Sequence, residues 1–248
     1  MIYSVVLLNM SIVVTNLTKV YNHQKAIDNI SFTAHQGEIL GFLGPNGAGK
    51  STTMKILSCF IPQTSGTAEV AGFDVIKNPM EVRRQLGYLP EHNPLYLEMY
   101  VKESLGFIAD LHQLQNKKAR IEEIIALTGL EQEQHKKLNA LSKGFRQRVG
   151  IAQSLIHDPQ VLILDEPTSG LDPAQLVGIR ALIRELGKTK TIIFSTHIMQ
   201  EAEQLCDRAI IINQGHLVCD ETLPDLMKKY PQYTLEEIFL NLVQPVQK

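Results

Sequence analysis

An eight-residue stretch, GPNGAGKS from Gly44 to Ser51, constrains the fold of this chain more than any other feature. Apolar residues 38–43 precede it and a helical pattern over 52–57 follows, so the stretch joins a strand to a helix. Its spacing, with four residues between the first glycine and Gly-Lys-Ser, is typical of a phosphate-binding loop. Glycines let backbone N–H groups turn toward a polyphosphate, and the helix adds its unpaired N–H groups. A plain glycine-rich turn leaves the Lys-Ser pair unexplained.

The composition is that of an ordinary globular protein. The chain has 248 residues, a net charge of -2, 44% hydrophobic and 20% charged residues, enough for one large domain or two small ones. With 24 basic against 26 acidic residues, nothing favours a nucleic-acid partner. Cys59, Cys206 and Cys219 lack the spacing of a metal or redox motif, so we expect reduced thiols that act as small buried hydrophobes in a cytosolic protein.

The first fourteen residues, Met1 to Val14, are largely apolar but lack the features of a membrane span or a signal peptide. Polar residues interrupt the run, which falls short of the roughly 18 apolar residues that a span needs. The first basic residue is Lys19, whereas a signal peptide begins with positive charge. We expect a leading β-strand here, with Met1 and Met10 as alternative starts. Any membrane role is expected to come through a partner.

Hydrophobic patterning predicts an α/β fold. Leu164 and Phe194 mark buried parallel strands, and the N-terminal region supplies short antiparallel strands. Apolar residues then recur every three or four positions, as at Leu105 and Ile108, which indicates amphipathic helices. The prediction is a P-loop NTPase (RecA-like) core with an antiparallel β subdomain and an inserted helical subdomain. The predicted boundaries are 11–90 and 158–221 for the core, 91–157 for the helical subdomain and 222–248 for a C-terminal tail, all within one domain over 1–248.

Charged residues follow the buried strands at the point where ligands of open α/β sheets bind. Asp165 and Glu166 end one apolar run, and His197 ends the next. In a phosphate-loop enzyme the first carboxylate can hold Mg²⁺ and the second can polarise the attacking water. A neutral imidazole at His197 can bind a γ-phosphate oxygen. A lone histidine at a strand end is more often structural, but the neighbouring site residues favour the phosphate contact here.

A second anion site is predicted in LSKGFRQR, where Ser142 and Gly144 stand at the start of a new helix. Serine and glycine at such a start supply an N-cap and free N–H groups. The stretch is about ninety residues from the phosphate loop and lies in the helical subdomain. We therefore expect it to serve the nucleotide of another subunit.

Together these motifs resemble the ATP-binding subunits of ABC transporters over essentially the whole chain. The resemblance rests on five motifs in the family's order and spacing, which are GPNGAGKS, LSKGFRQR in place of LSGGQ, LILDEP, SGLD and His197. More narrowly, GYLPEHNPLY and the closing LEEIF resemble the ABC-2 type exporter branch, and within it the ATP-binding subunits of gliding-motility-associated transporters.

The resemblance implies ATP and Mg²⁺ as cofactors and a head-to-tail dimer. Two ATP molecules are then sandwiched, each between the phosphate loop of one subunit and the signature of the other. Glu166 is the implied general base, and Tyr21, alone more typical of edge packing, is implied to stack on adenine. The implied site residues are Glu166, His197 and Lys50 for catalysis; Tyr21, Gly44, Pro45, Asn46, Gly47, Ala48, Gly49, Lys50, Ser51 and Thr52 for the nucleotide; Ser142, Gly144 and Asp172 for the partner subunit's nucleotide and the dimer seam; and Ser51, Glu91 and Asp165 for the metal.

Two stretches depart from the family pattern. Glu91 stands where the family usually has glutamine, and a carboxylate can ligate Mg²⁺ but adds negative charge near the γ-phosphate. We expect Glu91 to keep the metal and coupling role. In the signature, Lys143 and Phe145 replace glycine and glutamine. Lys143 either aids ATP binding across the seam or is a solvated surface charge.

The predicted function is ATP hydrolysis that energises separate integral membrane permease subunits, with export as the direction. The protein is then peripheral on the cytoplasmic face of the inner (plasma) membrane. The loop 92–102, with Tyr96 and Leu97, is apolar, and in the family this neighbourhood receives a short helix of the membrane subunit. Internal packing is the alternative for that loop. The alternative function is a soluble ABC-type ATPase with a non-transport partner, whereas a GTP switch lacks its Asn-Lys-x-Asp motif.

Overall fold

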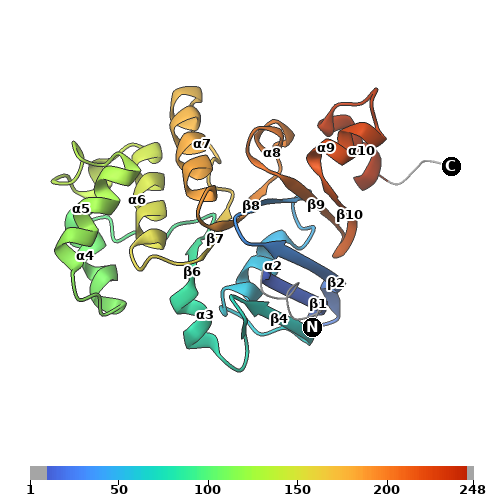
Figure 1. Cartoon of the computed structure of the whole chain (residues 1–248), viewed down its shortest axis with the longest axis horizontal. Coiled ribbons are helices and arrows are strands. Elements are labelled where there is room, and N and C mark those ends of the chain that lie inside the picture. The colour runs from blue at the N-terminus through green and yellow to red at the C-terminus, as the bar shows by residue number, and fades with distance from the viewer. Residues whose placement is uncertain (1–9, 245–248) are drawn as a thin grey trace.

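The computed structural model describes residues 10–244, which form two β-sheets surrounded by helices (Figure 1). An antiparallel four-stranded sheet has the order β2-β1-β4-β5, and a six-stranded sheet has the order β10-β9-β3-β8-β7-β6. The second sheet is parallel except for β10, which pairs antiparallel with β9 at one edge. The strands are β1 (Met10–Tyr21), β2 (Gln24–His35), β3 (Ile39–Leu43), β4 (Ser65–Val70), β5 (Phe73–Asp74), β6 (Leu86–Leu89), β7 (Val161–Asp165), β8 (Thr191–Thr196), β9 (Arg208–Asn213) and β10 (His216–Thr222).

Two separate groups of helices lie at the two ends of the molecule. α4, α5 and α6 form a lobe at one end, whereas α9 and α10 lie at the opposite end (Figure 1). The predicted α/β fold, with its antiparallel sheet and inserted helical region, is thus confirmed. The helices are α2 (Lys50–Leu57), α3 (Pro79–Gln85), α4 (Val101–Leu111), α5 (Lys117–Thr128), the 3₁₀ turn η1 (Leu138–Ala140), α6 (Lys143–Leu155), α7 (Pro173–Gly187), α8 (Met199–Leu205), α9 (Leu223–Lys229) and α10 (Leu235–Val243).

The N-terminal hairpin differs from the short strands that the sequence predicts. β1 and β2 are each 12 residues long, and their pairing register shifts at several points. Asn16 and Asn29 adopt positive φ angles of 49° and 54° at these shifts. Because asparagine tolerates this conformation, the strands bulge and resume pairing where the hydrophobic alternation is broken. Residues 1–9 of the predicted leading strand lie outside the described residues.

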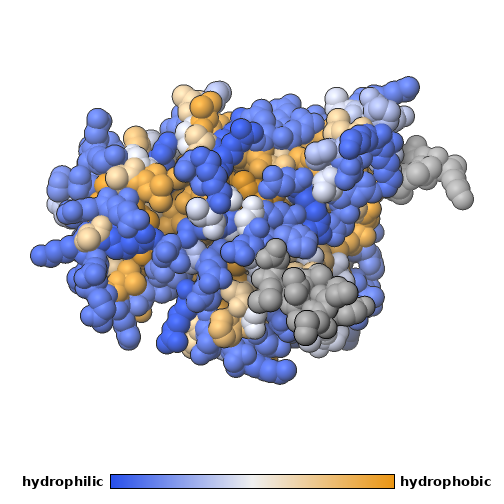
Figure 2. Space-filling model, viewed as in Figure 1, coloured by the Kyte–Doolittle hydropathy of each residue, from blue (hydrophilic) through white to orange (hydrophobic). Residues whose placement is uncertain are grey.

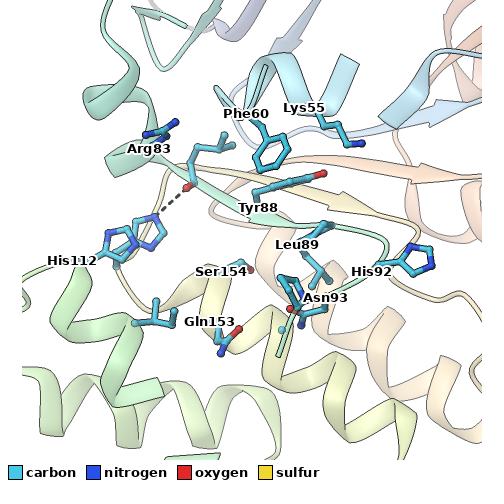
Figure 3. Close-up of a pocket in the computed structure, with 16 residues that line it drawn as sticks. Lys55, Phe60, Arg83, Tyr88, Leu89, His92, Asn93, His112, Gln153 and Ser154 are labelled. Carbon is cyan, nitrogen blue, oxygen red and sulfur yellow. Dashed lines mark hydrogen bonds between the residues drawn. The ribbon is translucent and has the colours of Figure 1, made fainter. Parts of the chain in front are cut away.

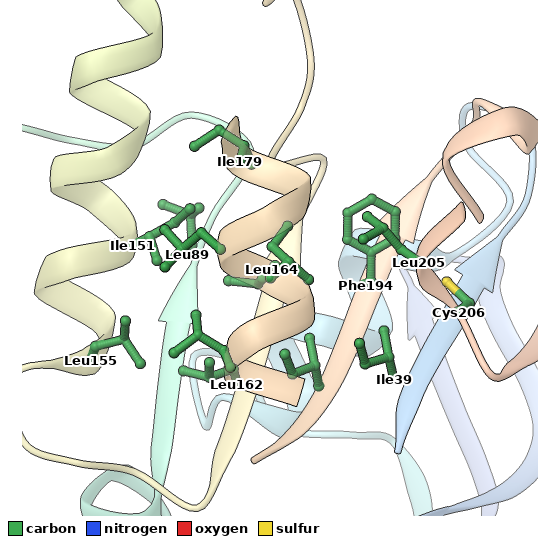
Figure 4. Packing of buried hydrophobic residues seen from close by; sticks show 14 of the residues in the cluster. Ile39, Leu89, Ile151, Leu155, Leu162, Leu164, Ile179, Phe194, Leu205 and Cys206 are labelled. Carbon is green, nitrogen blue, oxygen red and sulfur yellow. The ribbon is translucent and has the colours of Figure 1, made fainter. Parts of the chain in front are cut away.

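Strands β7 and β8 are buried on both faces, and their alternate side chains enter two separate cores. Leu162 and Leu164 pack with the helices, near Ile151 of α6 (Figure 4). Val161 and Ile163 belong to the other core, which the antiparallel sheet and α2 share. Packing on both sides therefore fixes the strands that lead to the site.

One face of the molecule is mainly polar, as expected for a globular chain. Hydrophilic residues cover most of the face shown in Figure 2, and apolar residues gather on it mainly around α6 and α7. No helix within residues 10–244 combines the length and the apolar character that crossing a membrane requires.

The central strands should be sensitive to loss of volume. Leu164 has no exposed surface, so Leu164→Ala should lower the free energy of unfolding by about 2–5 kcal/mol through lost burial and the cavity left behind. Urea denaturation measures the change. The control is Val177→Ala on α7, where the side chain is 66% exposed and a change within about 0.5 kcal/mol is expected. Equal effects at the two positions would contradict the packing described here.

Candidate functional site

Four strands of the parallel sheet deliver polar groups to one edge. β3, β8, β7 and β6 are neighbours, so the segments that follow them meet where ligands of open parallel sheets bind. The phosphate loop follows β3, Glu166 follows β7, His197 follows β8, and Glu91 lies just beyond β6. The β7–β8 register places Asp165 opposite Ser195. Sheet order thus joins motifs that are far apart in the sequence.

Two glycines of the phosphate loop have no room for a side chain. A Cβ at Gly44 would lie 2.4 Å from the carbonyl oxygen of Ile212, and one at Gly49 would lie 2.6 Å from that of Ala26. Gly49 also has a φ angle of 115°, which only glycine adopts readily. Because α2 begins at Lys50, the unpaired N–H groups of its first turn lie next to the loop and favour an anion there.

The ammonium group of Lys50 lies inside the phosphate loop. It donates hydrogen bonds to two loop carbonyl oxygens, at 2.7 and 3.3 Å, and lies 3.8 Å from Oε1 of Glu166. Burial lowers the pKa of Lys50, and the nearby carboxylates, Glu166 foremost, oppose that shift. An incoming phosphate offers this desolvated cation a stronger partner than a carbonyl oxygen.

Glu166 and His197 form a close pair at the mouth of the loop. Nδ1 of His197 lies 3.0 Å from both carboxylate oxygens of Glu166. The Glu166 side chain is only 8% exposed, whereas that of His197 is 48% exposed. Burial raises the pKa of Glu166, and the His197 and Lys50 side chains act against the rise. A carboxylate whose pKa is shifted toward neutrality is suited to accept a proton from water.

The backbone at Glu166 is strained, with a φ angle of 50°. Ser195 holds it by two contacts, since its carbonyl oxygen and its Oγ accept from the Glu166 N–H at 3.2 and 3.0 Å. The same hydroxyl donates to Oδ1 of Asp165 at 2.6 Å, and Asp165 is 2% exposed. Sequence reasoning missed Ser195. Its only signal was its position two residues before His197 in a buried strand.

The loop, Glu166 and His197 enclose a cavity of about 340 Å³. Of the residues predicted to bind the chain's own nucleotide and metal ion, Tyr21, Gly44, Ala48 and Asp165 do not line it. Tyr21 ends β1, is 44% exposed and has Nζ of Lys19 5.1 Å from its ring centre. Ala26 is a lining residue that the sequence did not indicate. The lining residues are Ala26, Pro45, Asn46, Gly47, Gly49, Lys50, Ser51, Thr52, Glu91, Glu166 and His197.

Ser142, Gly144 and Asp172 lie outside this cavity, at the starts of α6 and α7. Ser142 caps α6 by accepting a hydrogen bond from the Phe145 N–H, and Asp172 caps α7 through the Gln175 N–H. A Cβ at Gly144 would lie 2.5 Å from the Gln175 side chain. The starts of α6 and α7 are thus in contact. Because residue 144 is glycine, no side chain covers the backbone at that position.

Three oxygen donors suit a magnesium ion that a nucleotide brings. Ser51 and Glu91 line the cavity, and the carboxylate of Asp165 lies behind it, bound to Ser195. Within residues 10–244 no group of three or more His, Cys, Asp or Glu side chains is arranged to hold a metal ion by itself. Mg²⁺ commonly binds one or two protein oxygens together with substrate phosphates, so this donor set fits it.

Comparisons with known proteins agree on one family. The profile of the ABC transporter family matches residues 27–169. The bacitracin transport ATP-binding protein BcrA of Bacillus licheniformis is 41% identical over 221 residues, which cover 88% of this chain and 72% of BcrA.

Two solved structures are similar throughout. An ATP-binding subunit of an ABC transporter superimposes with a TM-score of 0.84 at 30% identity, covering 93% of this chain and 98% of its own. A dimeric ATP-binding cassette, solved in a post-hydrolysis state with ADP and Pi, gives a TM-score of 0.77 at 25% identity, covering 86% and 98%.

The burial of Glu166 predicts a pH-dependent cost to stability. At pH 7 the ionised carboxylate is desolvated, so Glu166→Gln should raise the free energy of unfolding of the nucleotide-free protein. Burial raises the pKa of Glu166 in the folded state. The extra stability of the Glu166→Gln variant should therefore shrink as the pH falls through this folded-state pKa. It should vanish near pH 4, around the unfolded pKa of glutamate, below which the group is protonated in both states.

Urea unfolding at several pH values between 4 and 7 measures this difference. The exposed Glu131 supplies the matched control, since Glu131→Gln removes a carboxylate that stays hydrated and should have little effect at any of these pH values. A Glu166→Gln protein that is less stable than the wild type at pH 7 would show that the Lys50 and His197 contacts outweigh desolvation.

Proposed function

The chain belongs to the ABC transporter ATP-binding family, and from that premise we propose how its residues hydrolyse ATP and what they assemble with. As a member, it is an ATP-hydrolysing subunit that energises a membrane permease. One observation carries the residue assignment, which is the contact of Glu166 with both His197 and Lys50 at the mouth of the phosphate loop.

In this proposal the loop and the start of α2 bind the phosphates of ATP. Lys50 leaves the loop carbonyl oxygens for the outer phosphates, where its charge stabilises the transition state. Glu166 accepts the proton of the attacking water, and His197 holds the carboxylate and contacts the γ-phosphate. Ser51, Glu91 and Asp165 would hold Mg²⁺, which neutralises charge that develops on the phosphate oxygens.

Glu91 keeps, in our proposal, the metal and coupling role that glutamine has in the family. Its place in the cavity supports this, because it lines the same space as Ser51 and Lys50. Tyr21 is proposed to stack on adenine just outside the cavity, where its ring is exposed at the end of β1.

A second subunit is proposed to complete each site, in a head-to-tail dimer. Ser142 and Gly144 would reach the partner subunit's γ-phosphate, with Asp172 at the seam. Their position at two adjoining helix starts outside the cavity supports a role toward another subunit. The similarity to a dimeric cassette solved with ADP and Pi supports the same arrangement.

ATP should therefore drive dimerisation when hydrolysis is blocked. Glu166→Gln removes the base but keeps the shape of the side chain, so ATP with Mg²⁺ should convert this variant from monomer to dimer. Size-exclusion chromatography with light scattering measures the mass with and without ATP. The double variant Glu166→Gln/Ser142→Arg places a bulky charge at the signature and should stay monomeric. A dimer that forms equally well without ATP, or with the arginine present, would contradict the shared site.

A separate integral membrane permease is proposed to dock beside α4. A groove of about 570 Å³ lies between β6 and the helical lobe, with Phe60, Tyr88 and His112 around it (Figure 3). The rings of His112 and His157 stack with their centroids 3.9 Å apart, and burial lowers the pKa of both, that of His157 to about 4, so this imidazole pair is uncharged at neutral pH. Lys55 and Arg83 place positive charge elsewhere on the groove. A short apolar helix of a permease fits such a groove.

Some apolar side chains of the loop 92–102 pack internally, and others are exposed and available to a permease. Leu95 and Met99 pack against the core, whereas Tyr96 and Leu97 are 62% and 44% exposed. The Tyr96 ring packs edge-to-face on the ring of Phe107 on α4, beside the groove, with the two ring centroids 5.9 Å apart. The exposed pair is therefore the part of the loop that we assign to the permease.

We propose the cytoplasmic face of the inner membrane as the location and export as the direction, the latter on the resemblance of GYLPEHNPLY to the exporter branch. A soluble ATPase with a non-transport partner is the alternative. The permease assay below separates the two.

Replacing Tyr96 and Leu97 by alanine should uncouple the permease while sparing basal ATP hydrolysis. Neither side chain lines the nucleotide cavity, so the rate of the isolated subunit should stay within about twofold of the wild type. Co-purification with the permease and permease-stimulated ATPase should both fall. Val177→Ala on the exposed face of α7 serves as the control. Failure of the double variant to fold would instead assign these side chains to internal packing.

A further inference from the structure

Glu201 is a buried carboxylate that the proposed hydrolysis does not use. It lies on α8, is 1% exposed and does not line the nucleotide cavity. Fully buried glutamates are rare unless they are paired. The nearest cation, Nη2 of Arg180, lies 3.9 Å from Oε1, and Nε of Arg180 has no hydrogen-bond partner in the described part of the chain. Charge pairing therefore accounts poorly for Glu201.

The carboxylate instead joins the two loops that carry Glu166 and His197. Its Oε2 accepts a hydrogen bond from Oγ1 of Thr168 at 2.5 Å and another from Oγ1 of Thr196 at 3.0 Å. Thr168 stands two residues after Glu166, and Thr196 stands directly before His197. Both threonines are buried, at 2% and 0% exposure, so water does not compete for these bonds.

In each loop, one further hydrogen bond closes a short turn that contains both the threonine and the catalytic residue. The Ser169 N–H donates to the Glu166 carbonyl oxygen at 3.1 Å, so the turn that begins at Glu166 contains Thr168. On the other loop, Oγ1 of Thr196 accepts from the Ile198 N–H at 3.0 Å, which brackets His197. Movement of either threonine is therefore transmitted to the pair at the cavity.

A strained residue keeps its conformation only where its surroundings determine it strongly. Glu166, at a φ angle of 50°, has Ser195 on one side. Hydrogen bonds to a charged acceptor are stronger than those between neutral groups. Glu201 accepts one from Thr168 at the far end of the same turn, and a second from Thr196 at the end of β8.

We propose that Glu201 is a positioning residue for ATP hydrolysis, which holds the Glu166 loop and the His197 loop together through Thr168 and Thr196. The inference rests on the proposed function, because it assigns Glu166 and His197 to hydrolysis. Glu201 is buried and does not line the nucleotide cavity, so it acts through the two threonines. It fixes the spacing at which His197 meets Glu166.

The test removes the hydroxyl groups and leaves the catalytic residues intact. Thr168→Val and Thr196→Val are nearly isosteric and should each lower kcat by about ten- to a hundredfold, as small misplacements of catalytic groups do. The KM for ATP and the ATP affinity should change little, because neither side chain lines the cavity. Thr168→Ser keeps the donor and should retain nearly the wild-type kcat.

Thr128→Val is the matched control. Thr128 is also buried, and its hydroxyl donates to the Ile124 carbonyl oxygen at 2.7 Å within α5, far from the two loops in the sequence. It should leave kcat unchanged. A wild-type kcat in folded Thr168→Val, or a loss confined to ATP affinity, would overturn the proposal.

Hydrogen exchange of the Glu166 N–H gives a readout that does not depend on activity. In the nucleotide-free protein this amide is bonded to Ser195, and it should exchange faster in Thr168→Val and Thr196→Val but not in Thr128→Val. Unchanged exchange in both Thr168→Val and Thr196→Val would overturn the positioning role. A wild-type protein without ATPase activity would contradict the proposed function instead, and the exchange measurement would still decide whether Glu201 holds the loops.

Discussion

The pairing of β7 with β8 is the constraint on which the rest of the site depends. Parallel pairing in a single register sets Asp165 opposite Ser195, and the hydrogen bonds of Ser195 then fix both Asp165 and the strained Glu166. Both strands are buried on both faces, so packing against the two hydrophobic cores prevents a shift in their pairing register. Glu166 and His197 meet at 3.0 Å as a consequence of strand register rather than of local sequence.

Electrostatics at this edge works against stability and in favour of ligand binding. Lys50, Asp165 and Glu166 are at least nine-tenths buried, and desolvation is the largest influence on the pKa values of Lys50 and Glu166. Their mutual attraction offsets only part of that cost. In the proposed function, ATP with Mg²⁺ would supply opposite charges both for Lys50 and for the carboxylates, and the charged groups of the protein are already in place before that ligand binds.

Sequence patterns predicted the elements that carry strong local signals. The phosphate loop, the buried strands at Leu164 and Phe194, and the helical region were all foreseen, because glycine spacing and hydrophobic periodicity report directly on local backbone geometry. The length of β1 and β2 was missed, since bulges at Asn16 and Asn29 break the alternation without ending the pairing. Ser195 and Glu201 were missed because a polar residue in a buried strand or helix has no local pattern that names its partner.

The sequence by itself determined which residues are available for phosphate and proton chemistry, because residue type and close spacing fix what a loop such as Gly44 to Ser51 can bind. The tertiary structure decided which of them act together. It brought Lys50, Glu91, Glu166 and His197 to one cavity and left Ser142, Gly144 and Asp172 outside it. The reason is physical: strand order and register are set by the burial of two hydrophobic cores, and such long-range packing is not encoded in any short stretch of residues.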